Sequence, residues 1–159
     1  MFFSDPLKSV GEILRVVVEQ GRVAFAVWAA KEANPFFSTV NDVVDRFVEA
    51  APEDPDAPSA FRFAASGKLA QILRTAGAKK ITERNLKFQI QAAISQEQFW
   101  RLRTEMSETL REQLAKIDLA QLPTIKQTVA EAAQKYFVSG TMNFPAEAWI
   151  ITGQKISPH

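Results

Sequence analysis

Carboxylates that could do acid or metal chemistry gather between Glu105 and Glu112. Glu105, Glu108 and Glu112 are spaced by three and four residues, so a helix would place them on one face. That face could hold a metal ion, but the only histidine, His159, is the last residue of the chain. Arginines that could pair with the carboxylates lie nearby, at Arg101, Arg103 and Arg111. We therefore favour a solvated ion-pair face and expect no metal and no catalytic histidine.

Aromatic side chains are the second group that could form a site. An apolar pocket could be lined by Trp28, Phe36, Phe37, Phe99, Trp100 and Phe144. Aromatic stripes at helical spacing more often bury area in a core, so core packing is the favoured interpretation. Asn34 precedes a proline, and a helix cap is favoured there over a substrate contact.

The composition indicates an ordinary globular chain of 159 residues, with 47% hydrophobic and 23% charged residues. A formal net charge of +1 and unclustered basic residues predict no nucleic-acid partner. The absence of cysteine excludes disulfides and thiolate zinc sites, and it fits a cytoplasmic location. No secretory signal or run of membrane-spanning length is present, so no membrane partner is expected.

Apolar periodicity predicts about five helices and three strands. The helices are expected to begin near Pro6, Pro35, Ser66, Ser95 and Asp118. Ser95 and Gln98 form a capping box, which fixes the start of the fourth helix. The strands are expected at Val23 to Trp28, Lys80 to Gln91 and Glu147 to Thr152.

The strand patterns indicate an α/β fold. Val23 to Trp28 is an unbroken apolar run, as is Ala148 to Ile151, and such strands are usually buried on both faces. The later half of the second strand alternates between apolar and polar residues, which is typical of a sheet margin. The first two strands are expected to be parallel, joined by a right-handed crossover.

A single domain is expected over the whole chain, 1–159. Its parts are a helix–strand–helix segment (1–50), an acidic proline-rich loop (51–60), a helix and strand (61–94), a helical insert (95–138), and a final strand and tail (139–159).

Several segments, in order, resemble the carboxyl-terminal half of class I S-adenosylmethionine-dependent methyltransferases, in a bacterial small-molecule branch. The segments are Glu12-Ile13-Leu14-Arg15-Val16, Gly21 to Trp28, Asn34-Pro35-Phe36-Phe37, Phe61-Arg62-Phe63, Phe99 to Arg103, and Phe144 to Glu147 leading into Trp149-Ile150-Ile151. The resemblance covers nearly the whole chain. No single motif is diagnostic, and the resemblance depends on the ordered set of segments.

The resemblance implies a partial Rossmann-like fold with a three-stranded mixed sheet. The strands would be the family's strands 5, 7 and 6, and strands 1–4 would lie upstream. The family's cofactor loop needs a Gly-x-Gly pair, and Gly11 and Gly21 do not form one. This chain alone is therefore expected to bind no cofactor, although the resembling family uses S-adenosylmethionine.

The resemblance also implies a substrate pocket under the helical insert. Arg103 and Met106 would lie near it, together with Trp28, Asn34, Phe99, Trp100 and Phe144. In the family, the region after strand 5 and these insert helices tend to cover the substrate.

Without strands 1–4, the strand Val23 to Trp28 would present an open hydrogen-bonding edge. A homodimer through this edge is expected, or a separate chain that supplies the front half. Two functions stay open: a methyltransferase-related protein that is inactive alone, or a non-catalytic homodimer that binds a small ligand or serves assembly. A complete small enzyme of another class is less favoured, because no nucleophile, base and orienting group can be assembled from these residues.

Overall fold

The computed structural model describes residues 1–48 and 54–156. The start of the expected loop 51–60 and the terminal His159 lie outside the described residues. The chain divides into two compact units. Unit 1 comprises Met1–Ala33, Asp54–Lys87 and Glu147–His159, and unit 2 comprises Asn34–Glu53 and Phe88–Ala146. Each unit has its own core, and the single domain expected from the sequence stays a prediction.

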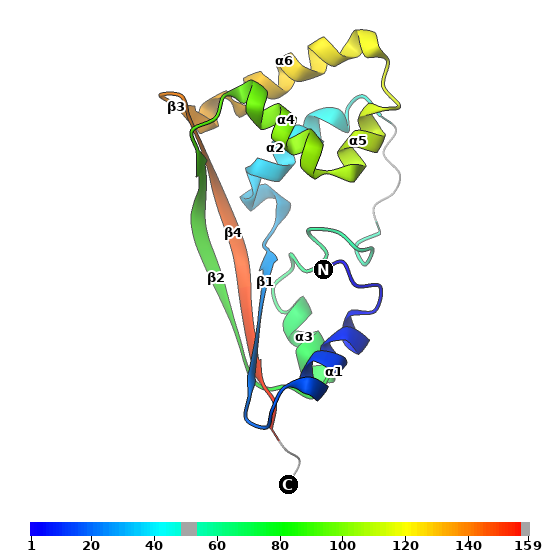
Figure 1. Cartoon of the computed structure of the whole chain (residues 1–159), viewed down its shortest axis with the longest axis vertical. Coiled ribbons are helices and arrows are strands. Elements are labelled where there is room, and N and C mark those ends of the chain that lie inside the picture. The colour runs from blue at the N-terminus through cyan, green and yellow to red at the C-terminus, as the bar shows by residue number, and fades with distance from the viewer. Residues whose placement is uncertain (49–53, 157–159) are drawn as a thin grey trace. The chain divides into compact units, whose positions relative to one another are not determined.

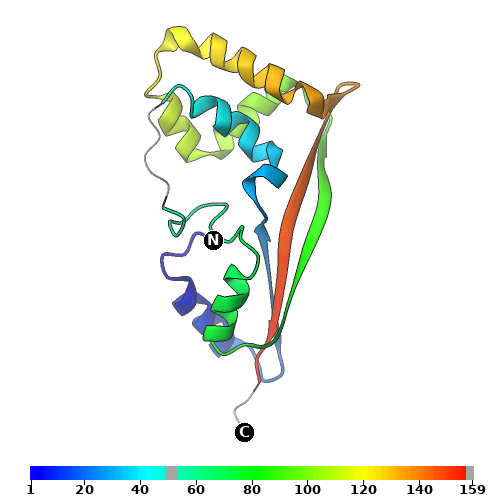
Figure 2. The ribbon, with the colours of Figure 1, turned by 180° about the vertical axis from the view of Figure 1, so that it is seen from behind.

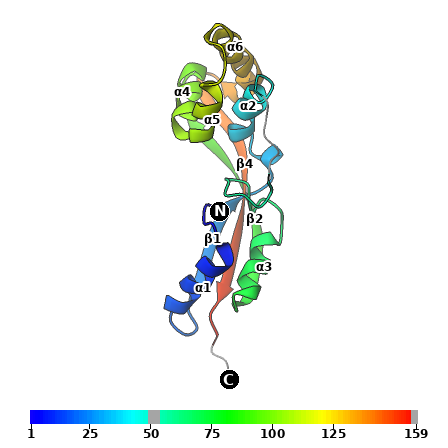
Figure 3. The ribbon, with the colours of Figure 1, turned by 90° about the vertical axis from the view of Figure 1, so that its right-hand side faces the viewer.

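Unit 1 contains two helices packed on strands (Figure 1). Its elements are α1 (Pro6–Val16), β1 (Arg22–Trp28), the 3-10 turn η1 (Lys31–Ala33) and α3 (Lys68–Thr75). Two long strands, β2 (Lys79–Ala92) and β4 (Thr141–Gln154), contribute residues to both units. α1 and α3 lie side by side over one face of the strands (Figure 3).

β1 is covered on one face only, contrary to the expectation from its sequence. Val23 and Val27 are buried, whereas Ala24 and Ala26 are exposed. Paired residues share a face, so Val23, opposite Gly153, and Val27, opposite Trp149, turn toward the helices. The expectation of two buried faces was wrong because alanine is apolar yet tolerates exposure, so an all-apolar run does not require two covers.

The helix starts of unit 1 show one confirmed cap and one correction. Asp5 caps α1, with the Lys8 amide donating to its carboxylate at 2.9 Å. Ser66 does not cap α3, since Gly67 holds that position at φ 81°. Instead, the Glu83 carboxylate of β2 accepts from the Gly67 amide at 2.9 Å and from the Ser66 hydroxyl at 2.8 Å. A residue 16 positions away in the chain performs the capping.

Unit 2 is a cluster of helices, seen from behind in Figure 2. Its elements are α2 (Pro35–Val44), α4 (Gln96–Met106), α5 (Glu108–Leu114), η2 (Leu119–Gln121), α6 (Leu122–Ala133), η3 (Gln134–Tyr136) and β3 (Phe137–Val138). The helix expected from Ser95 onward is two helices, because the Ser107 hydroxyl caps a new start by accepting from the Leu110 amide. The described residues therefore form six α-helices rather than five.

The core of unit 2 is aromatic. Phe99 and Phe144 are fully buried and stack at 4.9 Å, and Phe36 meets both edge-on at 5.6 and 5.8 Å. Tyr136 stacks on Phe144 at 4.3 Å. The capping box predicted for Ser95 and Gln98 is confirmed, with both reciprocal bonds present. These contacts hold α2, α4 and the strand β4 in one packed cluster.

The sheet follows the path β1-β4-β2, and β3 pairs with β4 off this path. β4 runs antiparallel to β1 and to β3. The three-stranded mixed sheet expected from the resemblance is therefore wrong in strand number, and β3 also changes the order of the complete sheet. β3 was missed because Phe137 and Val138 are too few residues for a period to appear. β4 also begins six residues before the expected Glu147.

Candidate anion-binding site

Arg103 is a buried cation on α4 of unit 2. Its side chain is only 4% exposed, although arginine is almost never fully buried unless paired. The helix phase explains the placement, because Phe99 and Trp100, four and three residues earlier, lie on the same buried face. The capping box fixes where α4 begins, and the Gln96 amide donates to the Ala130 carbonyl at 3.2 Å, which ties α4 to α6.

The contacts of Arg103 come from α2. Its Nη2 donates to the Asn41 Oδ1 at 3.2 Å. The guanidinium carbon lies 5.3 Å from the ring centroid of Phe36 and 5.0 Å from that of Phe37. These two rings meet edge-on at 5.1 Å, so the cation rests in an aromatic corner. Arginine suits such a corner because its guanidinium is planar and weakly hydrated.

No acid neutralises Arg103 within residues 1–48 and 54–156. The ion pairs of this part of the chain leave it out. Its Nε is buried without a hydrogen-bond partner. Burial lowers the pKa of Arg103 to about 10, so the group remains a cation at neutral pH. A buried, uncompensated cation is costly, and a strongly perturbed group of this kind is a functional-site candidate.

One part of the guanidinium stays available. Nη1 donates no hydrogen bond to a described residue. Nη1 is therefore the part of the guanidinium that no described residue engages. An anion approaching from that side would meet a fixed donor beside the rings of Phe36 and Phe37. The arrangement can bind a small carboxylate or phosphate, and it supplies no nucleophile or base.

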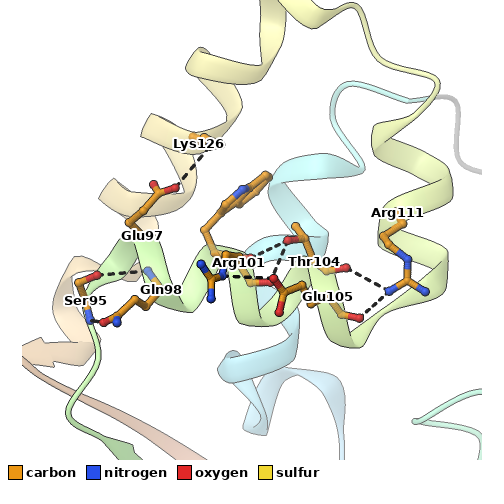
Figure 4. Close-up of polar contacts among 9 residues, drawn as sticks. Ser95, Glu97, Gln98, Arg101, Thr104, Glu105, Arg111 and Lys126 are labelled. Atoms are coloured by element: carbon orange, nitrogen blue, oxygen red, sulfur yellow. Dashed lines mark hydrogen bonds and ion pairs between the residues drawn. The ribbon is translucent and has the colours of Figure 1, made fainter.

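The outer face of α4 carries one of the ion pairs expected from the sequence (Figure 4). The expectation that Glu105, Glu108 and Glu112 share one helix face was wrong, because Glu108 and Glu112 lie on α5, after the helix break at Ser107. Arg101 pairs with Glu105 at 3.2 Å, and Arg111 donates to the carbonyl of Glu105. Lys126 of α6 lies 3.5 Å from the Glu97 carboxylate. The described residues contain no group of acids, histidines and cysteines that could hold a metal. Both side chains of the Arg101–Glu105 pair are exposed, which agrees with the ion-pair interpretation at Glu105.

The other residues expected to line a substrate pocket belong to both units, and their role in such a pocket stays a prediction. Phe99, Phe144 and Trp100 are buried in the core of unit 2, whereas Met106, three residues after Arg103, is 61% exposed at the end of α4. Asn34 is fully buried and precedes α2, where its carbonyl, rather than its side chain, accepts from the Phe37 amide at 3.0 Å. Trp28 ends β1 in unit 1 and is half-buried.

Sequence reasoning missed Asn41. Its position, four residues after Phe37 on α2, could have indicated a polar group beside the aromatic face. Its link to Arg103 spans 62 residues, and no local pattern reports such a contact.

The edge of β1 is the second feature with functional meaning. Within the described residues, β1 lies at the end of the strand path and pairs with β4 alone. The Ala29 amide donates to Glu147 and the Lys155 amide donates to Gly21, so odd-numbered residues turn their backbone groups toward β4. Ala24 and Ala26 therefore direct theirs outward, and both are exposed. This edge can accept a further strand.

No helix in the described part of the chain is long and apolar enough to cross a membrane. No protein-family model and no curated protein matches the sequence.

Among solved structures, the chain is similar to the YcgJ protein of Bacillus subtilis, at 15% identity and a TM-score of 0.46. It is also similar to a candidate methyltransferase of Bacillus halodurans, at 16% identity and a TM-score of 0.45. The matches cover 99% and 98% of this chain but only 60% and 65% of those proteins. The chain thus spans less than two thirds of their length, and at TM-scores this low the likeness carries no argument about fold or activity.

Proposed function

We propose that this chain is the carboxyl-terminal portion of a methyltransferase-related fold and that it binds a small acidic ligand at Arg103. The ordered resemblance of its segments, from Glu12-Ile13-Leu14 to Trp149-Ile150-Ile151, supports the family. The missing Gly-x-Gly pair supports the further proposal that this portion alone holds no S-adenosylmethionine and is inactive alone. The chain would then be a ligand-binding portion whose chemistry needs a cofactor-bearing partner.

The buried Arg103 carries the ligand proposal. A structural cation would normally have a carboxylate beside it, because the desolvation of an isolated charge is only partly offset by two rings and one amide. A ligand carboxylate at Nη1 would supply the missing charge. The surrounding rings favour a ligand that joins its acid group to an apolar or aromatic body.

Calorimetric titration with benzoate tests this proposal. The intact chain should bind benzoate and not benzamide, which has nearly the same shape but no charge. Arg103→Met should weaken benzoate binding by about tenfold or more, because the buried cation proposed to face the ligand is lost. Arg101→Met is the matched control on α4: Arg101 is exposed and ion-paired, so its removal should leave binding within about twofold.

Equal benzoate binding by the intact chain and the Arg103→Met variant would overturn the ligand site. S-adenosylhomocysteine, titrated separately, should give no binding. Measurable binding of that nucleoside would overturn the claim that this portion lacks the cofactor site, whatever the benzoate result.

The alternative function, a non-catalytic homodimer that binds a small ligand, is favoured by the open edge of β1. Two copies could join antiparallel, with Ala24 of one opposite Ala26 of the other and with Phe25 at the two-fold axis. Small alanines would let the backbones approach. The pairing is self-complementary, whereas a separate chain would have to supply a matching strand of its own.

Single cysteines test this dimer, since the chain has none of its own. In the proposed register, Phe25→Cys should form a disulfide-linked dimer, because directly opposed Cα atoms lie about 4.5–5.5 Å apart. Ala24→Cys and Ala26→Cys should each stay uncrosslinked alone and crosslink when mixed. A monomeric mass at micromolar concentration, with no crosslinking by any variant, would exclude the homodimer.

A further inference from the structure

The strands of unit 1 have one face that no described helix of this unit covers (Figure 1). α1 and α3 pack on the other face, where Val27 is buried. Paired residues share a face, so Ala24, opposite Thr152, and Ala26, opposite Ile150, lie on the uncovered side. Both alanines are exposed, and we call this side the open face.

β2 contributes a third row of side chains to the open face. The Thr82 hydroxyl shares a hydrogen bond of 2.6 Å with the Thr152 hydroxyl, which places Thr82 on this face. Side chains alternate along a strand, so Lys80, Arg84 and Leu86 lie on the same face as Thr82. All four of these β2 residues are exposed.

The open face carries cations and no acid. Its cations are Lys80, Arg84 and, by alternation from Ala24, Arg22 of β1. All three are exposed, and none makes an ion pair with a described residue. The one acid of β2, Glu83, turns to the covered face, where it caps α3. This charge pattern favours an acidic partner.

The cations lie on both sides of an uncharged strip. β4 runs between β1 and β2, so Arg22 and Lys80 belong to strands that are about 10 Å apart. Lys80 and Arg84 are about 13 Å apart along β2. The strip between them contains Ala26 and the half-buried Ile150. Alanine extends only one carbon atom from the backbone, so a partner element can come close to the strands.

The same pattern disfavours other partners. A second copy would set cations against cations. A lipid surface takes up large apolar side chains, and Leu86 is the only exposed one on the open face. Single-stranded nucleic acid needs exposed rings on which bases stack, whereas Trp28, at the end of β1, is half-buried.

We propose that the open face of unit 1 docks an acidic amphipathic helix of a partner protein. The helix lies along β4, with its apolar stripe on the uncharged strip and with acids on both flanks, toward the three cations. β1 spans about 20 Å, which matches about 13 helical residues. A helix layer on a sheet face is the arrangement by which α/β proteins bury such a face. The docking involves neither Arg103 nor the edge of β1, so it can fail separately from the proposed functions.

The probe is a fluorescein-labelled, acetylated peptide with two repeats of the heptad Leu-Ala-Ala-Leu-Glu-Ala-Glu. In a helix its leucines form one stripe with glutamates on either side. Fluorescence anisotropy with the full chain at about 0.15 M salt should show saturable binding. The same peptide with lysine in place of glutamate should not bind. A version with a central proline should bind about tenfold more weakly or worse, because proline breaks the helix.

The double variant R22E/R84E should weaken binding of the acidic peptide by about tenfold or more. Its matched control is K8E/R74E, which makes the same change in net charge on α1 and α3 and should bind within about twofold of the intact chain. All four side chains are exposed, so both variants should fold, which circular dichroism verifies.

Equal losses in both double variants would mean nonspecific attraction and would overturn the docking surface, as would an absence of binding by the intact chain. Amide spectra of the labelled chain should place the peptide-induced shifts at Ala24, Ala26 and Ile150, and shifts confined to α1 and α3 would overturn it as well. Phosphatidylglycerol vesicles and an oligothymidine are tested alongside. Binding of either one in place of the peptide would overturn the helical partner.

Discussion

The two units bury different kinds of side chain in their cores. Unit 1 has a mostly aliphatic core, in which Leu14, Val27 and Leu73 lie together with the buried Phe63, and its cations Arg22 and Lys80 are exposed. Unit 2 has an aromatic core around Phe99 and Phe144, and its cation, Arg103, is buried. The difference follows from the rings, because a π-face tolerates a cation that an aliphatic side chain would only desolvate. An aromatic core can therefore hold a buried cation that an aliphatic core would leave at the surface.

The largest expected effect comes from Phe144→Ala in unit 2. Phe144 is fully buried and stacks on both Phe99 and Tyr136, so its loss should lower the free energy of unfolding by about 3–5 kcal/mol. Urea unfolding measures this change. Phe88→Ala is the control, since Phe88 is 36% exposed and its removal should cost much less. Similar losses for both variants would contradict the aromatic core.

Leu73→Ala tests the aliphatic core in the same way. Leu73 is fully buried, and its Cδ2 lies close to where a Cβ at Gly153 would stand, so this strand position needs glycine for the close approach. The expected loss is about 2–5 kcal/mol, with a smaller deleted surface than for Phe144. Hydrogen exchange should quicken in α1, α3 and β1. Faster exchange confined to α4 and α6 would show that the two cores are not separate.

The next prediction concerns how the free energy of unfolding of the Arg103→Met variant depends on pH. Because burial lowers the pKa of Arg103 to about 10 in the folded chain, the unfolded chain holds this proton more tightly. Folded-state stability should then rise with pH above that value, by at most about 1.4 kcal/mol per pH unit, and the variant should lack this rise. Below that pKa both states are charged, and the full cost of burial is present.

The measurement is the difference in unfolding free energy between the intact chain and the Arg103→Met variant, followed from about pH 9 to about pH 11. Taking the difference cancels the contributions of the groups that both proteins share. A difference that stays constant over this range would show that Arg103 is not desolvated as described.

Glu147→Gln should have the smallest effect. A hydrogen bond from Lys87, with help from Asn85, lowers the pKa of the Glu147 carboxyl. Its contribution to stability is therefore present above the ordinary glutamate pKa and lost as pH falls through the lowered one. From about pH 5 to about pH 3, the intact chain should lose more stability than the variant in acid unfolding. Identical acid unfolding profiles of the intact chain and the variant would show that this ion pair does not contribute to stability.

Local patterns predicted much of the helical structure but not the contacts between distant residues. Asp5, Ser95 and Gln98 could be read as caps because each cap lies within three residues of its partner. Ser66 could not be judged in this way, since the carboxylate that actually caps α3 belongs to Glu83 on β2. The helix break at Ser107 was also missed, because the apolar stripe continues through it in the sequence.

The candidate sites were less accessible from the sequence. Arg103 could be singled out, but whether a described residue neutralises it depends on what α2 places beside it, and the sequence shows several carboxylates nearby on its own helix. The exposure of Ala24 and Ala26 likewise depends on which face of the sheet the helices cover.

The central claim is that Arg103 is a buried cation that awaits an anionic ligand. Its most direct test is the side-chain nitrogen spectrum of the labelled chain during benzoate addition. The account predicts that the Arg103 resonance shifts and saturates while that of Arg101 stays in place, and that benzamide moves neither. An unmoved Arg103 resonance at benzoate concentrations that saturate any binding, or equal movement of Arg101, would contradict it.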